Sequence, residues 1–198
     1  MPTVDFNNNT YYTISQGRIC TQHKTPVPGS VSRTNKNGKE VHETFHSALK
    51  GMITDIYVKD SEWGKFWMVV LNKNEVLQFQ YSSGYANGFL RALPNVDFTS
   101  EVVLAPKLTI EGEKQKGTIF INQGGKALKW FYTKEDPSDL PPLKKIKIKG
   151  KETWDSSDQM EFLENMVKEK IKPNLGGTKS KVHVEVHEEV EVDDKMPF

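Results

Sequence analysis

One short helical pattern interrupts a long series of strand-like segments, and this order limits the folds that the chain can adopt. In the segment GYANGFLRALPNV, Phe89, Leu90 and Leu93 have helical spacing, and the helix should end at Pro94. Three strand-like segments come before this helix and two come after it. Apolar and polar residues alternate in segments such as VLQFQYS, as they do in half-buried strands. The expected strands lie at residues 49–58, 65–72, 75–82, 101–111 and 117–123.

This order of strands and helix is the order of the OB-fold, a five-stranded Greek-key barrel with its helix between the third and fourth strands. The sequence therefore predicts a mainly β protein of this type. The segment TISQGRICTQHK is expected to form a short strand, and extra strands are expected at residues 127–133 and in the basic segment KKIKIKGK. Another small barrel or a sandwich could have similar short strands, and the position of the helix favours the OB-fold.

The chain is expected to have four parts. They are an N-terminal arm at residues 1–12, the OB-fold domain at 13–153, a C-terminal helix at 154–172 and an acidic flexible tail at 173–198. Within the helix, an apolar stripe is formed by Met160, Leu163, Val167 and Ile171. Ser156 and Gln159 have the spacing of a capping box at its start.

The composition favours a cytoplasmic protein. No window approaches the roughly 18 apolar residues of a membrane span, so no membrane partner is expected. The N-terminal residues lack the basic start and apolar run of a signal peptide. Cys20 is the single cysteine, which excludes an internal disulfide. We therefore expect the cytoplasm of a cell or of an infected host.

Enzyme motifs are missing from the sequence. It contains neither the phosphate-binding P-loop nor a Gly-x-Ser-x-Gly elbow. The nearest approach to a metal site is the set Cys20, His23, His42 and His46, whose residue types suit zinc. If both segments are extended, Cys20 and His23 point to opposite faces. We expect no enzyme activity, metal or cofactor, and a zinc-dependent enzyme is a less favoured alternative.

Aromatic and basic residues occur together on the predicted strands. Bases of single-stranded nucleic acid stack on aromatic rings, and lysines follow the phosphates. The residues expected to contact single-stranded DNA are Tyr57, Trp63, Trp67, Gln78, Gln80, Arg91, Lys107, Phe120, Lys126, Lys129 and Trp130.

Strand periodicity supports part of this set. Inward-facing Ile119 and Ile121 leave Phe120 facing out, and Gln78 and Gln80 are expected on an outer face for the same reason. The chain has 24 lysines and three arginines. This balance suits phosphate contacts that tolerate any sequence better than it suits bidentate reading of bases.

Charge is unevenly distributed along the chain. From Pro173 onward there are three lysines and six acidic residues, so the body is basic and the tail is acidic. The last six residues, DDKMPF, resemble the tip of bacterial and phage single-stranded DNA-binding proteins, which is typically Asp-Asp-Asp-Ile-Pro-Phe. Lys195 replaces an acid of that pattern, and the valine–acid alternation before the tip differs from the usual Gly-, Pro- and Gln-rich linker. The chain therefore resembles a divergent phage-type member.

The resemblance implies a protein that coats single-stranded DNA and recruits replication, recombination and repair proteins. The expected docking residues are Asp193, Asp194, Met196, Pro197 and Phe198. A partner could bind the ring of Phe198 in an apolar pocket and its carboxylate with a basic side chain.

Residues 182–192 could instead form a strand against the body. An OB-type RNA-binding protein or a protein-docking adaptor is the main alternative function. The sequence does not set the oligomeric state.

Overall fold

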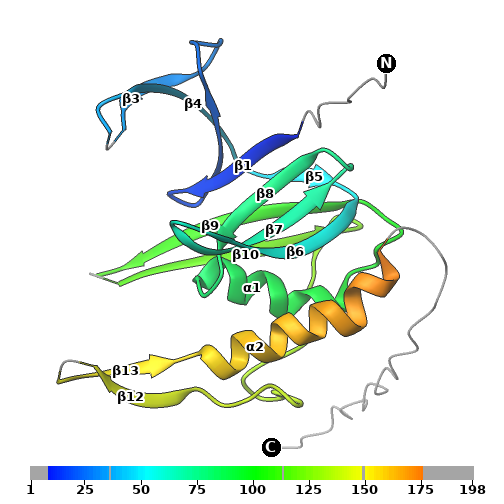
Figure 1. Ribbon diagram of the computed structural model, residues 1–198. Helices are drawn as coiled ribbons and strands as arrows, with labels where there is room; N and C mark the ends of the chain where they lie inside the picture. The colour runs from blue at the N-terminus through cyan, green and yellow to red at the C-terminus, as the bar shows by residue number, and fades with distance from the viewer. Residues whose placement is uncertain (1–8, 36, 113, 149, 176–198) are drawn as a thin grey trace, which may run out of the picture.

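The computed structural model describes residues 9–35, 37–112, 114–148 and 150–175. Within these ranges the protein is mainly β, as expected, with two α-helices beside a long sheet, a shorter sheet and a separate hairpin (Figure 1). Among the described residues, no helix is both long and apolar enough to cross a membrane. The expected docking residues, at positions 193, 194 and 196–198, and the possible strand at 182–192 lie outside the described residues.

The long sheet has seven strands, and the three at one end form an antiparallel meander. In spatial order the strands are β3 (Val31–Thr34), β4 (Glu40–His46), β2 (Arg18–His23), β1 (Thr10–Ser15), β8 (Glu75–Gln80), β7 (Gly64–Leu71) and β6 (Ile53–Ser61). Strand β1 pairs in parallel with β8, and the other described neighbours in this sheet are antiparallel. The strands expected at 65–72 and 75–82 are confirmed as β7 and β8.

The shorter sheet contains the last two expected strands. Its order is β11 (Lys126–Ala127), β10 (Lys114–Gln123), β9 (Val102–Glu111) and β5 (Leu49–Gly51). The strand expected at 49–58 is divided at Met52 into β5 and β6, so one segment of chain contributes to both sheets. The side-chain Oδ1 of Asn72 accepts a 3.0 Å hydrogen bond from the backbone N–H of Met52 and so stabilises this bend.

Helix α1 (Gly84–Ala92) lies between β8 and β9 in the chain, where the helical pattern predicted it. It begins after Ser83, whose Oγ accepts a 3.2 Å hydrogen bond from the backbone N–H of Ala86. The α-helix ends before Pro94, which lies in a short 3-10 turn.

Helix α2 (Ser157–Met166) continues through a π-turn and a 3-10 turn as far as Asn174. Its predicted apolar stripe is confirmed, because Met160, Leu163, Val167 and Ile171 are all buried. The expected capping box is wrong. The side chain of Ser156 makes no capping bond, and the buried Gln159 donates a 2.6 Å hydrogen bond to the carbonyl of Pro141 instead.

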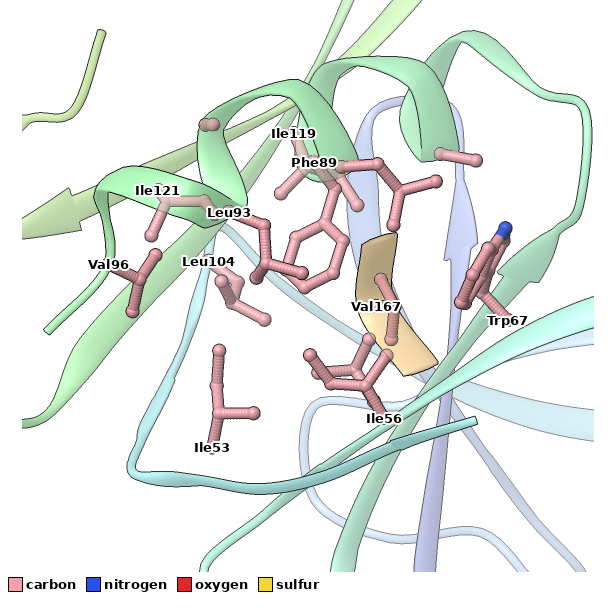
Figure 2. Close-up of a cluster of buried hydrophobic side chains, with 14 of the residues drawn as sticks. Ile53, Ile56, Trp67, Phe89, Leu93, Val96, Leu104, Ile119, Ile121 and Val167 are labelled. Carbon is pink, nitrogen blue, oxygen red and sulfur yellow. The ribbon is translucent and has the colours of Figure 1, made fainter. Parts of the chain in front are cut away.

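The main core lies between the two sheets and the helices. Figure 2 shows Phe89 of α1 and Leu93, which follows α1, pointing toward Ile119 and Ile121 of β10, with Val167 beside the core face of the β6–β7–β8 meander. All five are at most 1% exposed. Burial of such side chains contributes about 1.5–3 kcal/mol each, so this cluster fixes the meander against the helices.

Three segments differ from expectation. TISQGRICTQHK was expected to form one strand, but Gln16 and Gly17 have positive φ of 51° and 74° and form the turn of the β1–β2 hairpin. Residues 10–12, expected in the N-terminal arm, already belong to β1. The strand expected at 127–133 is wrong beyond Ala127, because the backbone N–H of Phe131 turns away to the carbonyl of Arg91.

The expected basic strand is confirmed as β12 (Lys144–Ile148). It forms a hairpin with β13 (Lys151–Asp155), which occupies the region where the C-terminal helix was expected to begin. In Figure 1 this hairpin extends away from the sheets at the N-terminal end of α2.

Candidate nucleic-acid interface

The outer face of the β6–β7–β8 meander carries aromatic, amide and basic side chains. Strand register places Tyr57, Met68 and Gln78 in one row across the strands, and Lys59, Phe66 and Gln80 in the next row. Paired residues of neighbouring strands share a face of the sheet. We call these six residues the outer face. The opposite face carries Trp67 and Phe79 and packs on the core.

A groove of about 320 Å³ lies on the outer face. It is lined by Lys59, Ser61, Trp63, Phe66, Met68 and Gln78. Met68 is buried at its floor, whereas Trp63 is 80% exposed at its rim. The groove therefore combines an apolar floor, an open aromatic side chain and the cation of Lys59.

The turn between β6 and β7 holds the backbone of Trp63. The hydroxyl of Ser61 donates a 3.0 Å hydrogen bond to the carbonyl of Gly64 and accepts a 3.2 Å bond from the backbone N–H of Trp63. Gly64 has a backbone φ of 110°, which L-residues other than glycine rarely adopt. The turn is therefore fixed at both ends while the indole ring stays exposed.

Tyr11 extends the outer face onto β1. It pairs with Val76 of β8, which in turn pairs with Val70 of β7, and Tyr11 is about half exposed. Burial raises the pKa of Tyr57, and the nearby Tyr11 and Asp55 raise it further. The Tyr57 hydroxyl therefore stays protonated near neutral pH and can donate a hydrogen bond.

The structure brings together four of the predicted site residues, Tyr57, Trp63, Gln78 and Gln80. Sequence reasoning missed Tyr11, Lys59 and Phe66 as members of the same surface. The alternation of β6 could have placed Lys59 beside Tyr57, because residues two apart share a face. Tyr11 carried no such signal, because its place depends on the pairing of β1 with β8.

The prediction that Trp67 contacts DNA is wrong. Trp67 is completely buried, and its ring stacks on Tyr81 with centroids 5.7 Å apart. It neighbours Phe66 in the chain and therefore points to the core when Phe66 points out. Trp67 thus contributes to the core rather than to the interface.

Arg91 also makes hydrogen bonds within the protein. Its guanidinium donates hydrogen bonds to the carbonyl of Tyr132 at 3.4 Å and to Oε1 of Gln159 at 3.3 Å, and it lies 5.8 Å from the ring of Trp130. Burial lowers the pKa of Arg91. Arg91 therefore makes a structural contact between α1 and α2, and its expected contact with phosphate stays a prediction.

The remaining predicted residues lie away from the groove. Lys107 and Phe120 share the outer face of the β9–β10 pair, and Phe120 is 40% exposed. Lys126 pairs with Gln123, so it lies on the other face of that sheet. Lys129 and Trp130 follow β11 in a segment without strand structure. The predicted set is therefore divided between separate surfaces.

The candidate zinc set does not converge. Register places His23 opposite His42, and Ile19 opposite His46, so the three histidines share one face of the β2–β4 pair. Cys20 is buried on the other face. In the ranges that the structure describes, no group of three or more His, Cys, Asp or Glu side chains could hold a metal ion.

The chain was compared with protein-family models, with curated proteins and with solved structures. None of the three comparisons gives a match. The functional assignment must therefore come from the residues and geometry of this chain.

Proposed function

We propose that the protein binds single-stranded DNA without sequence preference through the outer face of an OB-type barrel. The observation that carries the proposal is the groove in which Trp63, Phe66 and Lys59 meet. An exposed aromatic side chain beside a lysine is what a stacked base and its phosphate require. Amides at Gln78 and Gln80 add hydrogen bonds that any base can accept or donate.

The strand pairing supports the OB-type assignment. The meander β6–β7–β8 is followed by α1 and then by β9 and β10, and the β5–β6 segment pairs with both β7 and β9. On this assignment β7 and β8 are the second and third barrel strands. OB-folds bind oligonucleotides across these strands and at the loop between the first two, which here contains Trp63. Strand β8 pairs with β1 rather than with β10, so the barrel is open on that side.

The proposed role is to coat and protect single strands during replication, recombination or repair in a bacterial or phage-infected cytoplasm. We propose the recruitment of partner proteins because the tip DDKMPF resembles the tip of single-stranded DNA-binding proteins. A substitution of Phe198 tests this role. Phe198→Ala should abolish binding to a replication or repair partner and leave the affinity for DNA unchanged. Retained partner binding would contradict docking through the tip.

Titration of intrinsic tryptophan fluorescence with poly(dT), poly(U) and duplex DNA tests the function. We expect poly(dT) to quench the exposed Trp63 and to bind more tightly than the other two polymers. Trp63→Ala should weaken poly(dT) binding by about 1–3 kcal/mol, the range for one stacking side chain. Val31→Ala, which removes an exposed apolar side chain from the far edge of the same sheet, is the matched control.

Each other outcome has a defined meaning. Preference for poly(U) would assign the groove to RNA. Lack of binding to any of the three polymers would contradict the proposal and favour an adaptor that binds only proteins. Equal loss in Trp63→Ala and Val31→Ala would show that the groove is not the site.

A further inference from the structure

The β12–β13 hairpin stands apart from both sheets. Its two strands pair with each other and with no other strand that the structure describes. It continues directly into α2, and Lys144 forms an ion pair with Asp158 of that helix at its base. An isolated two-stranded hairpin is only marginally stable in water, so the ion pair and the continuous backbone hold it in place.

One face of this hairpin combines an exposed indole with lysines. Register pairs Lys145 with Trp154 and Lys147 with Glu152, so these four side chains share one face. Trp154 is 60% exposed, and Nζ of Lys145 lies 5.7 Å from the centre of its ring. Nζ of Lys145 is also 2.7 Å from Oε2 of Glu152. The ammonium covers one side of the indole and leaves the side away from it for another planar group.

The charge of the hairpin favours an anionic partner. Residues 144–155 contain five lysines and two acidic residues. A tryptophan kept in water beside an excess of lysines has the chemistry of a base-stacking and phosphate-binding site. Lys145 is paired with Glu152, so a protein partner with an apolar surface would leave Lys147 of this face without a counterion.

The hairpin lies on the opposite side of the meander from the groove. Its continuation, α2, packs on the core face, where Lys65 and Tyr81 bind Glu164. A strand of DNA bound on the outer face can therefore reach Trp154 only by passing an edge of the meander. We therefore expect a short oligonucleotide to fill the groove without reaching the hairpin.

We propose that the Lys145–Lys147–Trp154 face of the hairpin is a second contact for single-stranded DNA, engaged when the strand is long enough to leave the outer face. This inference rests on the proposed function and deepens it. It predicts a binding site longer than the groove alone, with part of the affinity dependent on strand length.

The test compares two oligothymidylates, one of about 6 and one of about 35 nucleotides, since a single OB-fold covers about 4–16. Trp154→Ala and Lys147→Ala should each weaken binding of the long strand, the first by roughly tenfold, and leave the short strand unchanged. Trp154→Phe keeps a stacking ring and should restore most of the loss. Lys39→Ala removes the same charge from an exposed position between β3 and β4 and is the matched control for Lys147→Ala. Circular dichroism melting curves confirm that each variant is folded.

The outcomes separate this inference from the proposed function. If Trp63→Ala weakens both strands while Trp154→Ala changes neither, the groove is the site and the second contact is wrong. Equal loss of both strands in Trp154→Ala also overturns the length dependence. Failure of the wild-type protein to bind either strand contradicts the proposed function itself. A wild-type dimer that Trp154→Ala converts to a monomer would assign the hairpin to a second copy of the chain and overturn the proposal.

Discussion

The hydroxyl of Tyr81, the residue that follows β8, donates a 2.7 Å hydrogen bond to Oε2 of Glu164 on α2, across 83 positions of sequence. Nζ of Lys65 lies 2.7 Å from the same oxygen, and Nζ of Lys168 lies 2.7 Å from Oε1. The Glu164 side chain is 13% exposed. One carboxylate therefore connects the core face of the meander to the helix that covers it.

Substitution of Glu164 by Gln should lower stability in a pH-dependent way. Burial alone would raise the pKa of Glu164, but the hydrogen bonds from Lys168, Lys65 and Tyr81 outweigh burial and lower the pKa to about 2. The ionised carboxylate therefore stabilises the fold above its unfolded pKa of about 4.3. We expect Glu164→Gln to lower the free energy of unfolding by about 1–3 kcal/mol at pH 7.

The stability difference between wild type and Glu164→Gln should shrink as the pH falls from about 4.3 toward 2, as measured by urea unfolding. Glu161→Gln changes an exposed acid on the same helix and should have little effect at any pH. A difference that stays constant down to pH 2 would contradict the role of the ionised carboxylate.

Substitution of Gly84 by Ala should destabilise the protein, although Gly→Ala in a helix usually stabilises by about 0.5–1 kcal/mol. A Cβ at this position would lie under 3.0 Å from the carbonyl oxygen of Gly117, a backbone atom of β10. Helix α1 would have to move away from the strand, at a cost of about 1–3 kcal/mol. Thermal melting measures the change. Asn87→Ala on the same helix is the control and should be neutral or slightly stabilising.

Binding to poly(dT) should weaken steeply with salt. Lysine–phosphate contacts release counterions, and each contact contributes a slope of about −0.7 to log K against log salt for single strands. Contacts by Lys59, Lys145 and Lys147 would give a slope of about −2. Fluorescence titrations between about 0.05 and 0.5 M NaCl measure it. A flat response would mean that these lysines do not contact phosphate.

Phe120→Ala tests whether DNA also crosses the β9–β10 pair. The ring is 40% exposed and should stack with a base, so its loss should weaken binding by about 1–3 kcal/mol. The melting temperature should change little because much of the ring is outside the core. Ile110→Ala, an exposed apolar residue on the other face of β9, should leave binding unchanged. If Phe120→Ala unfolds the protein, Phe120 has a structural role.

Periodic patterns of apolar residues predicted the strands and helices whose formation depends on residues close together in the sequence. The alternation in VLQFQYS predicted β8 and its inward Leu77 and Phe79, and the spacing of Phe89, Leu90 and Leu93 predicted α1. The β1–β2 hairpin was missed because its turn, Gln16–Gly17, lies inside a segment read as one strand. The strand expected at 49–58 is divided where Asn72 bonds the backbone of Met52. These residues are 20 apart in the sequence, so no local pattern predicts the division.

The candidate site was predicted in part, and its errors have a common cause. Phe66 and Trp67 are adjacent in an apolar run, which shows that one is buried without showing which. Trp154 was taken as the start of a helix, because the strand that exposes it depends on pairing with Lys145. The sequence predicted which side chains point to solvent where apolar and polar residues alternate. It did not do so where the pairing of distant strands determines the exposed face.

The parallel pairing of β1 with β8 has a consequence for folding during synthesis. Thr10 leaves the ribosome early, but its partner Glu75 is made only after the intervening strands. A distant pairing must also overcome a larger loop-closure entropy than the hairpin of β7 with β8. Strand β1, the first described strand to be synthesised, is therefore among the last to pair. Until it pairs, β8 has an unpaired edge that chaperones or DNA could cover.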